Sequence, residues 1–480
     1  MRLGFAKSDL TPRVGVELCG FGPFINRHSI AVRDRLWARA MAVEVGERRA
    51  VVISNDLAIV EQDTTVRIRE LIGEATGLPP EAIMVHCTHT HSGPNTSARL
   101  QGWGTLDPPY LEVLPQRIAA AGIQALANLQ EATLSHAEVP CEGIGLNREY
   151  DQDAPALEDV LRDDWRPAKP ELTDTTCHVL VAHALTPRPP LPGGEAENNL
   201  GPSVFPPSPC AAKQRDERGA GGEGPFGFAA YFGCHPVVCC SATRYIHGDY
   251  PGVAMNVLER EQPGSVGLFL QGAQGDVNSC VVHKPEPESL LALDIIAGRF
   301  ARAVREGLRR AAPLDITDMA YALHEVTFTR RALTRDDIAA RLDKQEAILH
   351  APGAADDDSQ VRMAAVYALA YRKLLAAMDR GESLEPPTQL HGLRLGPLAL
   401  LGTPFEMFQA IKNDVTWQAR SPLPLVMGLT GDGLGYAPDR DCAARGGYAA
   451  DMVPLMLGSL PFASIHDELV AALLALEAKL

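Results

Sequence analysis

A repeated local pattern constrains the fold of this chain more than any other feature. A short apolar segment, typical of a buried strand, runs directly into a loop of glycine and polar residues. Functional sites in open α/β sheets collect at the ends of strands, so side chains from such loops are expected to share one site. The pattern occurs five times, at 84–94, 232–236, 270–278, 401–406 and 429–436.

Predicted strands and helices alternate along the 480 residues without a repeat period. This alternation predicts an α/β fold, or a mixed α+β fold, with mixed sheets flanked by helices. We expect one large domain over 1–480, because motifs from both halves of the chain belong to the same pattern. Helices are predicted at 65–77, 110–127 and 290–310, twice within 336–380 with a break at 352–353, and from Ser464 with Asp467 in the capping-box position. Strands are predicted at 39–45, 50–54, 177–184, 226–233, 266–271, 393–401 and 425–429.

The most informative of the five segments contains the run Thr88-His89-Thr90-His91-Ser92-Gly93-Pro94. If the preceding strand continues through it, Cys87, His89 and His91 point to one face, since side chains alternate along a strand. Two imidazoles on one face can bind a divalent metal, or one can bind while the other transfers protons. An isolated pair of histidines with this spacing is more often hydrogen-bonded in a protein core. Other motifs in the chain are therefore needed to favour a metal site.

Two other strand-end loops carry potential metal ligands, namely His235 and Glu406. If they converge with His89, two histidines and one carboxylate leave an open position on a zinc ion, which is an arrangement of hydrolases. Zinc lowers the pKa of a water molecule from 15.7 to about 7. His91 is then the candidate acid/base or oxyanion-stabilising group. Taken alone, His235 reads as a buried strand-end histidine and Glu406 as a cap of a helix beginning near Met407.

The order of these motifs resembles the N-terminal catalytic region of the neutral/alkaline non-lysosomal ceramidase family. The resemblance covers most of the chain, and its most specific elements are 88–94 and Gly275-Asp276-Val277. The other matching segments, in order, are Gly20-Phe21-Gly22, 35–40, 52–56, Asn147-Arg148, His235-Pro236, 248–252, 404–406 and Gly435-Tyr436.

The resemblance implies a zinc-dependent amidase of lipid metabolism that hydrolyses the C–N bond of a small N-acyl amide. It assigns His89, His235 and Glu406 as metal ligands. It places Asn147 and Arg148 near the substrate, and it gives Asp249 and Asp276 the role of holding loops or orienting ligand histidines.

The chain departs from the family pattern at two site positions. Asn278 stands where the family has a serine, with Ser279 shifted by one, so a zinc-activated water is compatible with this sequence and a serine route is not. The family's tyrosine ligand aligns with Gly433. Tyr436, Tyr448 or water is then the fourth ligand, and Tyr436 alternatively contacts the reaction intermediate.

Two rival functions stay open at this stage. The first keeps the zinc hydrolase but changes the bond to an ester or a lactam. The second treats the altered serine and tyrosine positions as marks of a non-catalytic family member that acts as a binding protein.

Composition narrows the partners and the cellular setting. The formal net charge is −16 and no basic run occurs, which argues against nucleic-acid binding. No apolar stretch reaches the length of a transmembrane segment, and the first residues lack a secretory signal, so we expect a cytoplasmic protein with reduced cysteines. The family's C-terminal immunoglobulin-like domain is not expected. The Pro/Gly-rich segment 186–224 is expected to be a disordered or flap insertion, and association into a homo-oligomer is left open.

Overall fold

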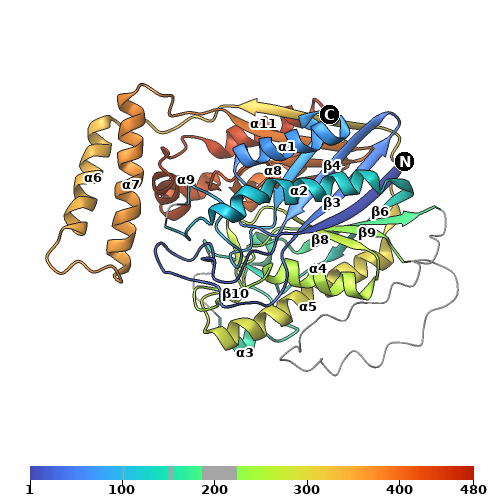
Figure 1. Ribbon diagram of the computed structural model, residues 1–480, viewed down its shortest axis with the longest axis horizontal. Helices are drawn as coiled ribbons and strands as arrows, with labels where there is room; N and C mark the ends of the chain where they lie inside the picture. Colours follow the sequence, from blue (N-terminus) through green and yellow to red (C-terminus); the bar gives the residue numbers. More distant parts are fainter. Residues whose placement is uncertain (101, 151–154, 186–223) are drawn as a thin grey trace.

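A mixed nine-stranded sheet forms the centre of the molecule, as the computed structural model of residues 1–100, 102–150, 155–185 and 224–480 shows (Figure 1). The strand order is β11-β9-β8-β6-β1-β3-β4-β5, with β13 paired to β6. The pairs β4–β5 and β9–β11 are parallel and the others are antiparallel. The strands are β1 (Arg2–Asp9), β3 (Trp37–Val45), β4 (Arg48–Asn55), β5 (Ile83–Cys87), β6 (Gln130–Pro140), β8 (Thr176–Ala184), β9 (Gly227–Phe232), β11 (Val266–Gln271) and β13 (Ala312–Pro313).

The two ends of this sheet curl toward each other. The hydroxyl of Ser54 on β4 donates to the carbonyl of Phe269 on β11 over 2.5 Å. The backbone N–H of Gln271 donates to Nε2 of His86 on β5 over 2.8 Å. The carboxyl ends of β5 and β11, and the loops that follow them, therefore lie together.

Helices cover both faces of the sheet (Figure 1). On one face α1 (Gln62–Thr76) packs on α2 (Pro108–Ala127), which crosses β1, β3 and β4; on the other lie α4 (Asp249–Glu261) and α5 (Glu286–Arg310). The helix predicted at 290–310 is α5, and its apolar face is part of the buried core. The residues of this face are Leu293, Ile296, Phe300 and Val304.

A second sheet with the order β14-β15-β16-β18 adjoins the first and is covered by α8 and α11. The single strand predicted at 393–401 is wrong, because the chain turns back at Gly396, where φ is +52°. A Cβ at Gly396 would lie 2.5 Å from the carbonyl oxygen of Asp315, so the turn requires glycine. The elements are β14 (Met319–Val326), β15 (Thr388–Leu395), β16 (Leu398–Gly402), β18 (Leu423–Met427), α8 (Gln409–Gln418) and α11 (Ile465–Glu477).

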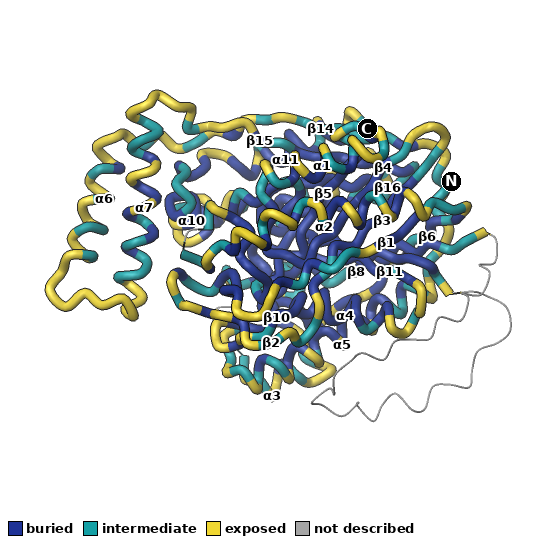
Figure 2. The backbone as a smooth tube through the Cα atoms, in the orientation of Figure 1, coloured by how far each residue is buried: buried dark blue, intermediate teal, exposed yellow. Residues whose placement is uncertain are grey.

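A two-helix hairpin is inserted between the paired strands β14 and β15. Helices α6 (Arg335–Leu349) and α7 (Ser359–Asp379) pack on each other and project from the body of the molecule (Figure 1). Figure 2 shows that most of α6 and the connection between the two helices are exposed, in contrast to the buried sheets. The predicted break at 352–353 is confirmed, and the projection meets the body through contacts of α7 with α10 (Val453–Met456).

Short elements complete the fold around the strand ends. Strand β7 pairs with β12, β17 with β19, and β2 with β10. They are β2 (Ala31–Val32), β7 (Gly145–Asn147), β10 (Tyr245–Ile246), β12 (Val277–Ser279), β17 (Glu406–Met407), β19 (Tyr436–Ala437), α3 (Leu157–Val160), α9 (Arg440–Arg445), two 3₁₀ turns (Pro80–Ala82 and Pro170–Leu172) and a π-helical turn (Tyr448–Met452).

The other expectations have mixed outcomes. The last helix begins after Ser464 as predicted, but the capping box is wrong, because Ser464 makes no side-chain cap and Asp467 pairs with Arg440. The cysteines among the described residues form no disulfide. None of the described helices is long and apolar enough to cross a membrane. The expected insertion at 186–224 falls, apart from its last residue, outside the described residues.

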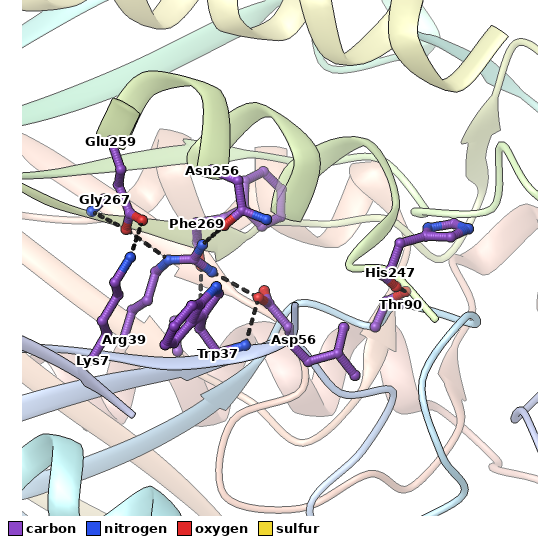
Figure 3. A network of polar contacts seen from close by, with 12 residues as sticks. Lys7, Trp37, Arg39, Asp56, Thr90, His247, Asn256, Glu259, Gly267 and Phe269 are labelled. Atoms are coloured by element: carbon purple, nitrogen blue, oxygen red, sulfur yellow. Dashed lines mark hydrogen bonds and ion pairs between the residues drawn. The ribbon is translucent and has the colours of Figure 1, made fainter. Parts of the chain in front are cut away.

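A buried ion-pair network fixes the end of β4. The guanidinium of Arg39 contacts Asp56 over 2.7 Å, Glu259 over 3.0 Å and Asn256 over 2.6 Å. Figure 3 shows Arg39 between Asp56 at the end of the strand and the two α4 residues. Asp56 also accepts the backbone N–H of Trp37 over 3.0 Å. The loop that begins at Asp56 is therefore tied to both the sheet and α4.

Candidate metal centre

His89 lies beyond the end of β5, in the loop that follows it. The expectation that the strand continues through His89 and His91 is wrong, because β5 ends at Cys87 and His89 has a φ of +73°. The backbone N–H of His89 donates to Leu57 over 2.9 Å, and its Nδ1 lies 2.8 Å from the carbonyl oxygen of Ala58. Since a carbonyl only accepts, Nδ1 carries a proton, and Nε2 is the ring nitrogen that faces the site.

His235 is held in the same way by a different loop. Its backbone N–H donates to Val277 over 2.9 Å, and its Nδ1 lies 2.5 Å from the carbonyl oxygen of Gln274. Nδ1 therefore carries a proton, and Nε2, which lies 2.8 Å from Oε2 of Glu406, is the ring nitrogen that could bind a metal. His235 follows β9 directly, so both histidines stand where the sequence pattern placed them, at strand ends.

Glu406 completes the group from β17. One carboxylate oxygen, Oε2, lies 2.8 Å from Nε2 of His235 and 3.3 Å from Nε2 of His89. Burial raises the pKa of this carboxyl, but the two imidazoles outweigh burial and hold the pKa well below 4.5. Glu406 is thus a buried carboxylate facing two histidine nitrogens.

The three side chains form a group that could hold a metal ion. Their ligand atoms all lie within 4.8 Å of one another, and all three residues are buried. Atoms that surround one tetrahedral metal at 2.0–2.2 Å are about 3.3 Å apart, which matches the separation of His89 and Glu406. The distance between His235 and Glu406 would have to lengthen by about 0.5 Å. Both histidines also have the carbonyl partner on Nδ1 that metal-binding histidines usually have.

His91 faces the same point from the far side of His89. Its Nε2 lies 3.2 Å from Nε2 of His89, and its buried Nδ1 has no hydrogen-bond partner. Burial, together with the charges of His89 and His235, lowers the pKa of His91 well below 6.5. His91 thus lies beside the ligand group with one ring nitrogen unpartnered, and its acid/base role stays a prediction.

Gly20 allows His91 to occupy this position. A Cβ on Gly20 would lie 2.3 Å from Nδ1 of His91, and the φ of Gly20 is +93°. The backbone carbonyl of His91 in turn accepts a hydrogen bond from the guanidinium of Arg27, which is buried. Arg27 could not be predicted from the sequence, because an isolated arginine in a loop carries no pattern that would reveal its role.

Tyr436 and Arg148 form the wall next to Glu406. Tyr436 on β19 is paired in register with Glu406 on β17. The guanidinium of Arg148 lies 4.8 Å from the centre of the ring of Tyr436 and 5.9 Å from that of Tyr448. Burial raises the pKa of Tyr436 well above 10, so its hydroxyl stays protonated and can donate.

Gly433, which aligns with the family's tyrosine ligand, lines the pocket without a side chain. A Cβ there would lie 2.4 Å from Ile59, so a larger residue does not fit this backbone. The choice among Tyr436, Tyr448 and water as fourth ligand stays a prediction. Tyr448 is half exposed, and Tyr436 is buried.

Asp276 links the substrate-side residues to the segment that carries Glu406. Its carboxylate accepts the side-chain amide of Asn147 over 2.9 Å and the backbone N–H of Gln409 over 2.9 Å. Its backbone carbonyl accepts the N–H of Arg148 over 2.8 Å. Asn278 follows on β12 and lines the same pocket. Asn147 therefore contacts Asp276, and Arg148 is the member of this pair that reaches the pocket.

Asp249 holds the turn that follows His235. Its carboxylate accepts the backbone N–H groups of Val238 and Cys239 over 3.3 and 3.2 Å. Cys239, His247 and Asp249 form a second buried group with metal-ligand atoms. Nδ1 of His247 accepts the N–H of Asp249 over 3.1 Å, so this group is joined by internal hydrogen bonds.

The ligand group opens into a pocket of about 460 Å³. One end is polar and holds His89, His91, His235 and Glu406. The other end is apolar and comes from three regions far apart in the sequence, which no local spacing could have joined. It includes Leu100, Trp103, Met363, Val453, Met456 and Leu457.

Comparison with solved structures identifies the class of fold as that of ceramidases. Neutral ceramidase from Pseudomonas aeruginosa superposes with a TM-score of 0.69 and 17% sequence identity, covering 100% of this chain and 75% of the other. A ceramidase complexed with C2 gives a TM-score of 0.69 and 18% identity with the same coverage. No family model and no curated protein matches the sequence. The chain has the neutral ceramidase fold, and the predicted resemblance and fold class are confirmed.

Proposed function

We propose that this chain is a zinc-dependent hydrolase that cleaves the C–N amide bond of an N-acyl substrate. The observation that carries the proposal is the convergence of His89, His235 and Glu406 from three distant loops. Their ligand atoms meet in a pocket of the size small-molecule sites have. The solved structures with this fold include a neutral ceramidase, which supports an amide substrate.

The residues around the ligand group have distinct parts in such a hydrolysis. A bound zinc ion supplies an activated water and polarises the carbonyl. His91 accepts a proton at Nε2 and returns it to the leaving amine. The hydroxyl of Tyr436 and the guanidinium of Arg148 face the pocket and donate to an oxygen that gains negative charge.

The apolar end of the pocket suits an acyl chain. The wall formed by Met363, Val453 and Met456 offers apolar surface that a hydrocarbon chain would remove from water. An N-acyl substrate would thus place its carbonyl at the histidines and its chain along this wall.

Metal analysis of the purified protein tests the ligand assignment. We expect zinc in the wild type and a loss of zinc affinity of more than about 100-fold in His89→Ala, which removes a direct ligand. His350→Ala, at an exposed histidine, is the matched control and should keep the metal. Full zinc content in His89→Ala would contradict the assignment.

A substrate panel tests the bond. N-acyl amines, amino-acid amides and aryl esters, assayed with and without a chelator, separate an amidase from the ester and lactam hydrolases. Chelator-sensitive cleavage of N-acyl amines is the expected result. A protein without metal and without activity on any of these compounds would instead be a binding protein.

A further inference from the structure

Arg148 has an unusual position for a charged side chain. One of its terminal nitrogens, Nη2, is buried without a hydrogen-bond partner. The guanidinium lies against two tyrosine rings, at 4.8 and 5.9 Å from their centres. A buried guanidinium nitrogen without a partner is costly, and a ligand that brings negative charge would remove that cost.

The pocket offers Arg148 little negative charge of its own. Among the described residues that line it, Glu406 is the only carboxylate, and its Oε2 faces the two ligand histidines. Arg99, the other arginine in the lining, is already paired with Asp432. In a chain of net charge −16, Arg148 and a bound divalent metal give this pocket a local positive charge.

We propose that the substrate carries a carboxylate on its amine portion, as an N-acyl amino acid does, and that Arg148 binds this carboxylate. The proposal rests on the proposed amide hydrolysis and names its substrate class. Arginine presents a planar fork of donors that matches a carboxylate, and Nη2 is one donor still free for it.

The position of Arg148 favours an α-carboxylate over one at the far end of an acyl chain. Arg148 lies against Tyr436, whose ring is 6.3 Å from that of His235. An α-carboxylate is separated from the amide nitrogen by one carbon, so it stays close to the bond that breaks. The acyl chain can then follow the apolar residues of the pocket, of which Val453 and Met456 pack in one cluster with Tyr436.

The reaction is balanced without a further reactant. The oxygen of water bonds to the acyl carbon and the C–N bond breaks. The proton that water loses passes through Nε2 of His91 to the leaving nitrogen. The products are a fatty acid and an amino acid whose carboxylate Arg148 has held throughout.

A matched pair of substrates tests the proposal. N-lauroylglycine and N-lauroylethanolamine have the same acyl chain and the same scissile amide bond. The first carries a carboxylate where the second carries a hydroxymethyl group. Release of laurate by the zinc-loaded wild type is expected to show a preference for N-lauroylglycine of at least about tenfold in kcat/KM. Arg148→Gln should lower both rates but reduce that preference to near one, whereas Arg148→Lys should retain part of it.

Two controls separate this role from others. Arg445→Gln changes an exposed arginine that pairs with Glu149, the neighbour of Arg148, and should leave the preference intact. Inhibition by laurate, measured in wild type and in Arg148→Gln, shows whether Arg148 binds only the carboxylate of the released fatty acid. Circular dichroism and zinc content confirm that each variant is folded and loaded.

The outcomes are distinct. No preference in the wild type, or an equal loss of both activities in Arg148→Gln, would overturn the carboxylate proposal while leaving amide hydrolysis in place. Laurate inhibition that depends on Arg148 without a substrate preference would assign the arginine to the product and also overturn it. Failure to hydrolyse either compound would count against the proposed function itself.

Discussion

The backbone N–H of Gln409 donates to the carboxylate of Asp276 over 2.9 Å. Gln409 begins α8, three residues after Glu406, and Asp276 follows the loop whose Gln274 carbonyl holds His235. One hydrogen bond therefore connects the segment that carries Glu406 with the loop whose Gln274 holds His235.

This carboxylate gives the first prediction. Burial raises the pKa of Asp276 to about 7, against 3.8 for an unperturbed group. The pKa of Asp276 is thus higher in the folded than in the unfolded protein. Its favourable contribution to the free energy of unfolding is therefore present at low pH and is lost as pH rises from about 4 to about 7. The difference corresponds to up to about 4 kcal/mol.

Asp276→Asn removes this titration. We expect the free energy of unfolding of the wild type, measured with urea, to fall relative to that of Asp276→Asn as pH rises from 4 to 7. Asp163→Asn, at an exposed aspartate, should follow the wild type. A difference between wild type and Asp276→Asn that does not change with pH would show that the carboxylate stays ionised.

Substitution of Gly20 should displace His91 without touching the metal ligands. In Gly20→Ala the new methyl group would meet Nδ1 of His91 at 2.3 Å, so the ring must move. Misplacement of a catalytic group by about 1 Å can cost about 100-fold in rate, and we expect a loss of that order in kcat.

The matched control for Gly20→Ala is Gly15→Ala. Gly15 has a similar φ of +99°, but a Cβ there meets nothing within 4 Å. Both variants carry the backbone strain of alanine at positive φ, so the difference between them reports the contact with His91. Equal activity of the two variants would remove the basis for this prediction.

Replacement of His91 should separate proton transfer from metal binding. His91→Gln is expected to retain zinc, since His91 is outside the three-residue ligand group, and to lose about 10²–10⁴-fold in kcat. Metal analysis and steady-state kinetics on one preparation measure both. Loss of zinc together with activity would instead make His91 a ligand.

The Arg39 network should be a main source of stability near the site. Arg39→Met leaves two buried carboxylates, Asp56 and Glu259, without their guanidinium partner. Removing one member of a buried ion pair costs about 3–5 kcal/mol, and we expect urea unfolding to show a loss in this range. Arg35→Met, at an exposed arginine paired with Asp9, should change stability by less than about 1 kcal/mol. A loss of unfolding free energy in Arg39→Met as small as that in Arg35→Met would contradict the prediction.

Local patterns predicted much of the fold. The helix predicted at 110–127 is α2, and the strand predicted at 266–271 is β11. These elements have strong periodicity or clear bounds, which is why single-sequence reasoning reaches them. The turn at Gly396 was missed because 393–401 is apolar on both sides of a glycine, and the sharp reversal depends on contact with Asp315.

The ligand group itself could be predicted only through the order of motifs. His89, His235 and Glu406 are far apart in the sequence, and no spacing rule joins them. The left-handed backbone of His89 has no signature in the sequence, because it depends on the loop that Asp56 anchors. His466 likewise has no signature in the sequence: it is buried, and its Nε2 lies 3.0 Å from a carboxylate oxygen of Asp414.

The projecting hairpin supplies Met363 to the pocket, although it is inserted between two strands that pair directly with each other. Its length and sequence can therefore change while β14 and β15 keep their register. For the proposed N-acyl substrate, this separates the length of the pocket from the chemistry of the proposed metal ligands. Grafting a longer, shorter or differently lined pair of helices would change which acyl chains fit the pocket and would leave His89, His235 and Glu406 in place.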